Sequence, residues 1–253
     1  MQIFKKLFHL LYIIWALFSF FILMIIVVIF VFLFLPFGKT IGGNLIYTAC
    51  NVWAICWHFL IGIHYKEIHE SPHNKKEQFI FVGNHTSYMD APCVARSIRQ
   101  PVRVLGKYEM VKYPLFGIIY RAIVVVVDRS SPEKRAQSLR ALSAALHKDL
   151  SIFIFPEGTF NMDDTKPLKD FYDGAFRLAI ETQTPIKPII YPDSKTRMHW
   201  QSFQSLNAGS LTAIFLHPVQ VNDFTNESQI PELKQLVYDK MDEALRRYNV
   251  YPA

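Results

Sequence analysis

A histidine and an aspartate that lie five residues apart could together move a proton. Both occur in the stretch Asn84-His85-Thr86-Ser87-Tyr88-Met89-Asp90. Histidine takes up and releases a proton near neutral pH, which suits a general base. A carboxylate on its second ring nitrogen would fix the tautomer and stabilise the protonated ring. The pair therefore indicates base catalysis, although a motif this short often occurs by chance.

The spacing of the two residues sets a condition on the backbone. Five residues of regular helix turn through about 500°, so His85 and Asp90 would lie on different faces of one helix. They can meet only if His85 lies in a loop and Asp90 in the first helical turn. The apolar run Phe79–Gly83 predicts a buried strand that leads into this loop. Ser87 suits the N-cap, and a capping box that leaves Asp90 only a structural role fits equally well.

A second candidate follows the apolar run Val124–Val127. Arg129 comes directly after it, and groups just past strand ends line the ligand crevice of an open α/β sheet. A guanidinium there could hold a phosphate through two hydrogen bonds. The alternative is a solvated charge ahead of a helix that Ser131 caps and Pro132 begins.

A third candidate is the turn after the run Ser151–Phe155. Backbone amides around Gly158 and the Thr159 hydroxyl could form a small anion site, and Glu157 could accept a hydrogen bond from a substrate hydroxyl. The alternative is a type I turn with Pro156 at its second position and Gly158 at its fourth.

The elements that must position these residues alternate from Lys66 onward. After a predicted polar loop over Glu67–Gln78, continuous apolar runs alternate with helical patterns, which predicts an α/β fold whose mixed, mostly parallel sheet is flanked by helices. The predicted strands are Phe79–Val82, Val102–Leu105, Ile123–Val127, Ile152–Phe155, Ile186–Ile190 and Leu211–Leu216. The predicted helices are Ala91–Ile98, Glu109–Arg121, Pro132–Lys148, Gly174–Thr182 and Pro231–Tyr248.

The N-terminal part differs sharply in composition. Only His9 and Ser19 interrupt the apolar run Leu7–Leu35, which would extend about 43 Å as a helix, beyond the roughly 30 Å hydrocarbon core of a bilayer. The run is too long for a signal-peptide core, and we interpret it as a retained membrane helix in preference to a buried core helix.

A second N-terminal segment, Ile41–Tyr65, is predicted as an amphipathic helix. It could lie in the membrane interface or on the first helix, or it could pack on the α/β domain. The two helices form a predicted two-helix membrane-binding segment over residues 1–65, followed by the α/β domain over residues 66–253. The predicted apolar stripe contains Leu45, Ala49, Val52, Trp53, Cys56, Leu60 and Ile63.

The amino-acid composition indicates which classes of binding partner the chain could have. The chain is 51% hydrophobic and carries a formal net charge of +6, which suits a bilayer surface or anionic substrates. No dense run of Lys and Arg indicates nucleic acid. The three cysteines, Cys50, Cys56 and Cys93, lack metal-ligand spacing, and we expect no metal.

Taken in order, these motifs resemble the membrane-associated glycerolipid acyltransferases, best known from the 1-acylglycerol-3-phosphate (lysophosphatidic acid) acyltransferases. The resemblance covers about residues 78 to 218 and also implies an N-terminal membrane-binding helical pair. Its four blocks are Asn84–Asp90, the strand that ends at Arg129, Phe155–Thr159, and Thr184–Pro188 after Gly174-Ala175-Phe176.

The resemblance implies a reaction. His85 would take the proton from an acceptor hydroxyl while Asp90 orients it, and the hydroxyl would attack the thioester of acyl-CoA or an acyl carrier protein. It implies direct transfer to a lysophospholipid, first of all 1-acyl-sn-glycerol-3-phosphate, giving phosphatidic acid without a cofactor. It also implies a membrane location, with the catalytic domain at the cytoplasmic face of the cell inner membrane.

The resemblance also implies a binding pocket for the acceptor. Arg129 would hold the acceptor's phosphate, and Glu157, Gly158 and Thr159 would complete the pocket. Lys107 matches a basic position in relatives and would add positive charge.

The sequence departs from the family pattern at two positions. Phe160 stands where relatives commonly carry Arg, and Ile123 lies near the place of a frequent glycine. Lys107, Lys169 or Arg177 could supply the missing cation, or the acceptor could be another lysolipid. Two further readings stay open: a thioester or lipid hydrolase that uses the same base on water, and a membrane adaptor without activity.

Overall fold

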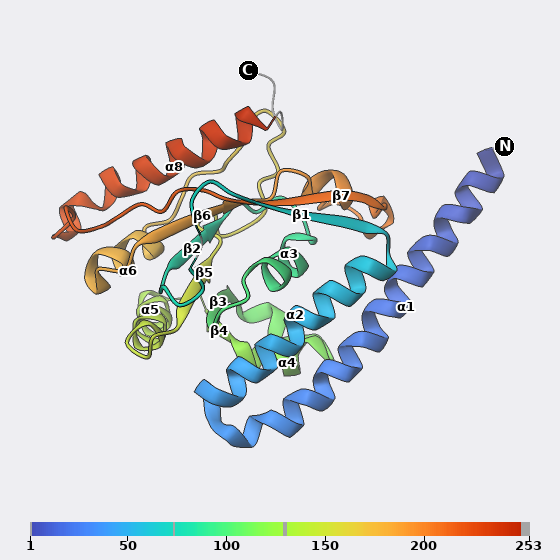
Figure 1. Cartoon of the computed structure of the whole chain (residues 1–253), viewed down its shortest axis with the longest axis horizontal. Helices are drawn as coiled ribbons and strands as arrows, with labels where there is room; N and C mark the ends of the chain where they lie inside the picture. The colour runs from blue at the N-terminus through green and yellow to red at the C-terminus, as the bar shows by residue number, and fades with distance from the viewer. Residues whose placement is uncertain (1, 73, 129–130, 249–253) are drawn as a thin grey trace.

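A seven-stranded sheet forms the centre of the molecule (Figure 1). The structure, a computed structural model, describes residues 2–72, 74–128 and 131–248. The strand order is β1-β7-β6-β2-β5-β3-β4, and all neighbours are parallel except β6 and β7. The mixed, mostly parallel sheet is thus confirmed. The strands are β1 (Ile63–His69), β2 (Ile80–Gly83), β3 (Val102–Lys107), β4 (Val124–Val127), β5 (Ser151–Ile154), β6 (Ile186–Ile190) and β7 (Gly209–Phe215).

Each face of the sheet carries its own hydrophobic core. Side chains alternate along a strand, so Phe81 of β2 faces one core while Ile80 and Val82 face the other. Helices α1 to α4 cover the first face, and α5, α6 and α8 cover the second. The helices are α1 (Gln2–Phe34), α2 (Gly43–Leu60), α3 (Asp90–Ser97), α4 (Phe116–Ile123), α5 (Pro132–Leu146), α6 (Gly174–Thr182), α7 (Ser194–Arg197) and α8 (Ile230–Arg247).

The predicted elements are largely present. Each of the six predicted strands occurs within two residues of its expected ends. The predicted helix Glu109–Arg121 is divided into a 3-10 helix over Tyr108–Lys112 and α4. Pro114 disfavours helical backbone before it, and Leu115 adopts a positive φ of 60°, so the chain turns between the two pieces.

The edge strand β1 is the element that the sequence did not predict. Its residues were assigned to the end of a helix and to a polar loop, yet all seven pair in parallel with β7, from Ile63 opposite Gly209 to His69 opposite Phe215. Only Ile63 is buried in this strand. An edge strand with so little buried apolar surface is specified by its pairing partner and hardly by its own pattern.

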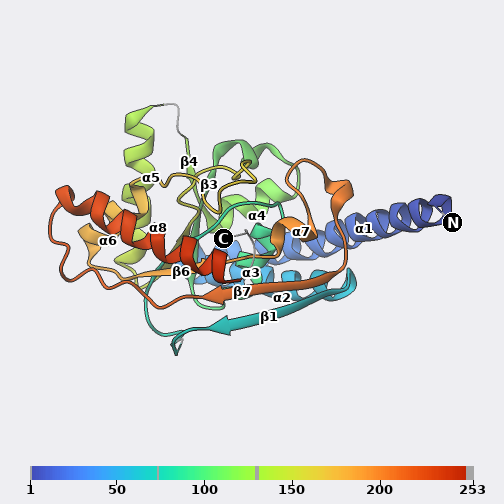
Figure 2. The same ribbon diagram turned by 90° about the horizontal axis from the view of Figure 1, so that it is seen from above.

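Helices α1 and α2 run antiparallel as a hairpin, hereafter the N-terminal hairpin (Figure 1). The indole Nε1 of Trp57 in α2 donates to the carbonyl of Ala16 in α1 at 3.0 Å. The N-terminal part of α1 extends beyond the α/β domain (Figure 2) and exposes large apolar side chains along its length. Among the described residues, one helical stretch, Gln2–Leu60, is long and apolar enough to cross a membrane.

The face of α2 that packs on the domain is not the predicted stripe. Asn51 and His58 are buried, whereas Leu45 and Val52 are exposed. The reason is a polar contact: the Asn51 amide donates to the carbonyl of Ile98 at 3.1 Å, just after the end of α3. The apolar stripe instead faces outward or toward α1, so α2 packs on both α1 and the domain.

The turn of the N-terminal hairpin is also tied to the sheet. Arg103 of β3 is buried and donates to the carbonyl of Lys39 at 2.6 Å and to the Asn44 side-chain oxygen at 2.9 Å. These charge-assisted bonds satisfy a guanidinium that would otherwise be costly to bury.

Candidate active site

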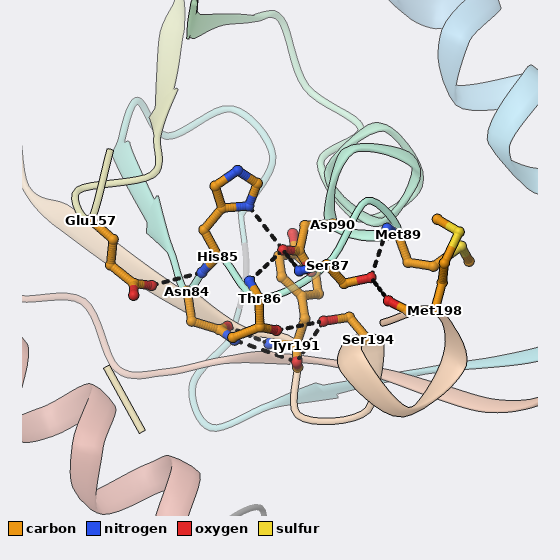
Figure 3. Close-up of polar contacts among 10 residues, drawn as sticks. All are labelled: Asn84, His85, Thr86, Ser87, Met89, Asp90, Glu157, Tyr191, Ser194 and Met198. Atoms are coloured by element: carbon orange, nitrogen blue, oxygen red, sulfur yellow. Dashed lines mark hydrogen bonds and ion pairs between the residues drawn. The ribbon is translucent and has the colours of Figure 1, made fainter. Parts of the chain in front are cut away.

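The loop after β2 brings His85 and Asp90 together (Figure 3). The His85 Nδ1 lies 2.9 Å from Asp90 Oδ2, and the same oxygen accepts the backbone N–H groups of Thr86 and Ser87 at 2.8 Å each. Asp90 is fully buried and is the first residue of α3. The predicted placement, with the histidine in a loop and the aspartate in the first helical turn, is confirmed.

Ser87 does not cap α3 in the predicted way. Met89 occupies the cap position, without a side-chain cap, and Ser87 Oγ accepts the Met89 N–H at 2.9 Å in the turn before the helix. Asp90 still reaches back to the Ser87 N–H, as in a capping box. One carboxylate oxygen therefore holds the loop and contacts the histidine at the same time.

The hydrogen-bond partners define the state of the His85 ring. An ionised carboxylate can only accept, so Nδ1 donates to it, and in the neutral form of the ring Nε2 keeps its lone pair. Figure 3 shows the second ring nitrogen pointing away from Asp90. The side chain is 19% exposed, and the ring lies between Phe155, at a centroid distance of 4.0 Å, and Phe160, at 4.3 Å. The ring is thus held by Asp90 on one side and is partly accessible from outside.

Glu157 supports the same loop from the neighbouring strand β5. Its side chain is fully buried, with Oε1 accepting the His85 N–H at 2.7 Å and Oε2 accepting the Lys169 N–H at 2.9 Å. Burial raises the pKa of Glu157 to about 8, against the lowering effect of the two N–H groups, and the nearby Asp90 also raises it. Both oxygens thus face backbone donors.

The turn that carries Glu157 spans the four residues of the alternative turn predicted from the sequence, Phe155 to Gly158. The Gly158 N–H donates to the carbonyl of Phe155 at 3.0 Å, which closes a four-residue turn. Gly158 adopts a φ of 70°, a value that glycine tolerates best. Two residues past Thr159, the Asn161 N–H donates to the His85 carbonyl at 2.7 Å, so the segment after β5 fixes the base on both sides.

Two supporting contacts were not predicted. Asn84 Oδ1 accepts the Tyr191 N–H at 2.8 Å, just after β6, and the hydroxyls of Thr86 and Ser194 lie 3.2 Å apart (Figure 3). Polar residues that directly follow buried strands were the available signal, since neighbouring parallel strands end at the same sheet edge.

The remaining predicted site residues are spread over several segments of the chain. Thr159 follows the Gly158 turn, and Lys107 is the exposed last residue of β3, roughly two strand spacings or about 10 Å from β2 in the sheet. Arg129 lies outside the described residues. Arg177, one candidate for a compensating cation, pairs with Glu227 at the surface.

The described residues contain no group of three or more His, Cys, Asp or Glu side chains that could hold a metal ion. The three cysteines have no disulfide partner, and Cys50 and Cys93 are buried. The donor set around His85 is therefore a base, a carboxylate and backbone amides.

Comparison with known proteins places this geometry in a family. The sequence model of the Acyltransferase family matches residues 63–192, which is 130 of the 253 residues and includes His85, Asp90 and Glu157. The chain belongs to the acyltransferase family. The matched range begins with β1 and ends just after β6, so it includes every strand of the sheet except β7.

Individual acyltransferases show how far the similarity extends. A 1-acyl-sn-glycerol-3-phosphate acyltransferase from Limnanthes alba is 32% identical over 209 residues, which are 80% of this chain and 66% of that protein. One from Haemophilus influenzae is 25% identical over 70% of this chain and 73% of its own. The crystal structure of the 1-acyl-sn-glycerophosphate (LPA) acyltransferase PlsC from Thermotoga maritima superposes with a TM-score of 0.73 at 18% identity, over both whole chains, and shows the same fold.

Replacement of Glu157 tests its part in holding the loop. In Glu157→Gln an amide NH2 replaces one acceptor oxygen, so a buried N–H of His85 or Lys169 loses its partner. We expect a loss of about 1–3 kcal/mol in the free energy of unfolding, measured by denaturant titration of the whole chain in detergent. Glu243→Gln, on the exposed face of α8, is the matched control.

The same pair of proteins gives a pH test. The folded pKa of Glu157, about 8, lies above the ordinary value of 4.5, so the folded chain holds a proton that the unfolded chain releases between these values. This contribution to stability is complete below about pH 4.5 and is lost as the pH rises through about 8. The wild type should lose stability relative to Glu157→Gln over this interval, and parallel curves would contradict the assignment.

Proposed function

We propose that this acyltransferase moves a fatty acyl group from an acyl thioester, acyl-CoA or acyl carrier protein, to the free hydroxyl of a lysophospholipid. The first candidate acceptor is 1-acyl-sn-glycerol-3-phosphate, with phosphatidic acid as the product. The observation that carries the proposal is the contact of 2.9 Å between His85 Nδ1 and Asp90 Oδ2, which leaves Nε2 as the outward-facing base. The names of the relatives support the choice of acceptor.

In the proposed reaction, His85 Nε2 accepts the proton of the acceptor hydroxyl as its oxygen attacks the thioester carbonyl. The new C–O bond forms, the C–S bond breaks, and the thiolate leaves with the proton that His85 returns. Asp90 stabilises the imidazolium during the step. No covalent acyl-enzyme is needed.

The acceptor's phosphate is proposed to bind beside the base, on the β5 and β3 side of β2. Gly158 and Thr159 follow β5 and Lys107 ends β3, so these three belong to the carboxyl edge of the sheet, where ligands of α/β proteins bind. Arg129, which lies outside the described residues, is proposed as a further phosphate ligand from the sequence alone. Glu157 completes the pocket indirectly, through the backbone of the loop that it holds.

We propose residues 1–65 as a membrane anchor and residues 66–253 as the catalytic unit. The exposed apolar side chains of α1 support this assignment. The expected location is the cell inner membrane, with the catalytic unit at the cytoplasmic face.

An acyl-transfer assay on the detergent-purified chain tests the proposal. Labelled acyl-CoA and acyl carrier protein would each be offered with a panel of lysophospholipids, and both acylated lipid and free acid would be followed. Acylated lipid identifies the acceptor and supports the proposal. Release of free acid without acylated lipid would show that the chain is a hydrolase. Absence of any product with every acceptor would contradict the proposal that the chain transfers acyl groups.

Arg129→Ala tests the phosphate pocket. We expect the acceptor KM to rise by about tenfold or more, because a charge-assisted hydrogen bond contributes about 1.5–3 kcal/mol, while the donor KM changes little. Steady-state kinetics with each substrate varied in turn measures both. Arg140→Ala, at an exposed position of α5, is the control, and an unchanged acceptor KM would remove this role from Arg129.

A further inference from the structure

A row of aromatic rings leads from the base to the outside of the domain. Phe160 lies 4.3 Å from the His85 ring, Tyr88 lies 4.9 Å from Phe160, and Phe203 lies 4.7 Å from Tyr88, all between ring centroids. We call Phe160, Tyr88 and Phe203 the aromatic row. Tyr88 is 40% exposed and Phe203 is 53% exposed, so the row is an accessible apolar surface and not part of a core.

The outer end of the aromatic row meets the N-terminal hairpin. Phe203 begins a short 3-10 helix, Phe203–Ser205, and the carbonyl of its next residue, Gln204, lies 2.7 Å from His9 Nε2 of α1. A hollow of about 530 Å³ lies beside this contact, between α1 and the segment before β7. Its lining residues are Phe4, Lys5, Phe8, His9, Tyr12, Asn207 and Ala208.

The outer end of the aromatic row therefore lies close to α1, whose exposed side chains are largely apolar. The exposed side chains of α1 include Phe4 and Phe8 at this contact, and Trp15 lies two turns further along the helix. A hydrocarbon chain that reached Phe203 from the side of α1 could stay on aromatic surface as far as His85. Exposed apolar surface of this extent in a protein usually marks a binding site.

The aromatic row is uncharged, whereas the candidate phosphate pocket contains a basic residue, Lys107. None of its three side chains carries a formal charge, and Phe203 belongs to the segment between β6 and β7. Lys107 and the Gly158 turn lie on the other side of β2, after β3 and β5. Phe160, the inner end of the row, directly follows Thr159, so the row begins beside the candidate pocket and only its outer end, Phe203, lies on the other side of β2. A lipid with one acyl chain and one anionic headgroup could thus place its headgroup in the pocket and its chain along the row, with the two meeting near His85.

We propose that the aromatic row binds the acyl chain of the acceptor lysolipid and determines its preferred length. This inference rests on the proposed acyl transfer and adds the subsite for the acceptor's chain. The row guides the chain from α1 and holds the headgroup end with its hydroxyl at His85 Nε2. Each methylene that the row removes from water would raise kcat/KM by about fourfold, up to the length that the row covers.

Chain-length kinetics tests the proposal. The wild type, Tyr88→Ala, Phe203→Ala and the control Leu236→Ala, an exposed position on α8, would be assayed with short-, medium- and long-chain acceptors in detergent at a fixed donor. We expect the preference for long over short acceptors to fall by about tenfold in the two row variants, with the control and the donor KM unchanged. An unchanged acceptor preference in both, or a changed donor-chain preference instead, would overturn the proposal.

A second measurement works without turnover. A lysolipid with a photoreactive group in its acyl chain would be cross-linked to the His85→Ala chain in detergent, and the labelled peptides identified by mass spectrometry. Labelling of peptides that contain Tyr88, Phe160 or Phe203, lost in competition with unlabelled lysolipid, supports the proposal even if the acyl-transfer assay fails. Labelling of other peptides alone would overturn the proposal. Reduced binding of the row variants to vesicles, with the labelling unaltered, would make the row a membrane contact and would also overturn the proposal.

Discussion

His85→Ala should reduce kcat by about 10²–10⁴-fold or more while the chain still folds. The expected loss is the usual contribution of a positioned general base. The backbone contacts of this residue remain in the variant, since its N–H bonds Glu157 and its carbonyl accepts from Asn161. Single-turnover and steady-state rates of acyl transfer, together with thermal unfolding followed by circular dichroism, measure both effects.

The control for this prediction is His217→Ala, which removes an exposed histidine near the end of β7. It should leave kcat and the unfolding temperature unchanged. Turnover of His85→Ala at the wild-type rate would show that another group takes the proton. A large drop in unfolding temperature would instead mean that the ring acts mainly through its packing on Phe155 and Phe160.

Asp90→Asn should lower kcat by about 10²–10⁴-fold with a smaller effect on folding. The asparagine oxygen can take the place of Oδ2 and keep the three donors, whereas the amide NH2 takes the place of Oδ1. The charge that stabilises the imidazolium is lost. Oδ1 is buried and has no hydrogen-bond partner among the described residues, so the unpaired NH2 should cost about 1–3 kcal/mol of stability.

Asp90→Ala separates charge from structure in the same experiment. It leaves the N–H groups of Thr86 and Ser87 without their acceptor and should unfold more readily than Asp90→Asn in a denaturant titration. Equal kcat for wild type and Asp90→Asn would mean that the carboxylate only holds the loop. The rates must be compared where both variants remain folded.

The sequence predicts those parts of the fold that bury their own side chains. The residues of β2 are non-polar throughout and all of them are buried, so the local pattern is sufficient to predict this strand. It fails for β1, where pairing with β7 defines the strand, and for α2, where Asn51 is buried because it reaches the carbonyls at the end of α3. Such contacts depend on the arrangement of distant segments and leave no local signal.

The candidate site divides in the same way. The loop position of His85 and the helical position of Asp90 follow from a spacing of five residues. The support by Glu157 from β5 does not, because it joins residues 72 positions apart through two strands that happen to be neighbours in the sheet. Phe160 was noted as a departure from the family pattern, but only the fold places its ring against His85.

The hydrogen bonds between the N-terminal hairpin and the α/β domain affect whether the two parts can be separated. Arg103 bonds the hairpin's turn to β3, and Asn51 holds the segment just after α3, whose first residue is Asp90. Removing the hairpin would uncover part of one hydrophobic core and leave the Arg103 guanidinium with the carbonyl of Val102 alone among its described acceptors. We therefore expect the N-terminal hairpin and the α/β domain to fold together, so that neither could be exchanged for that of a relative without changes in the other.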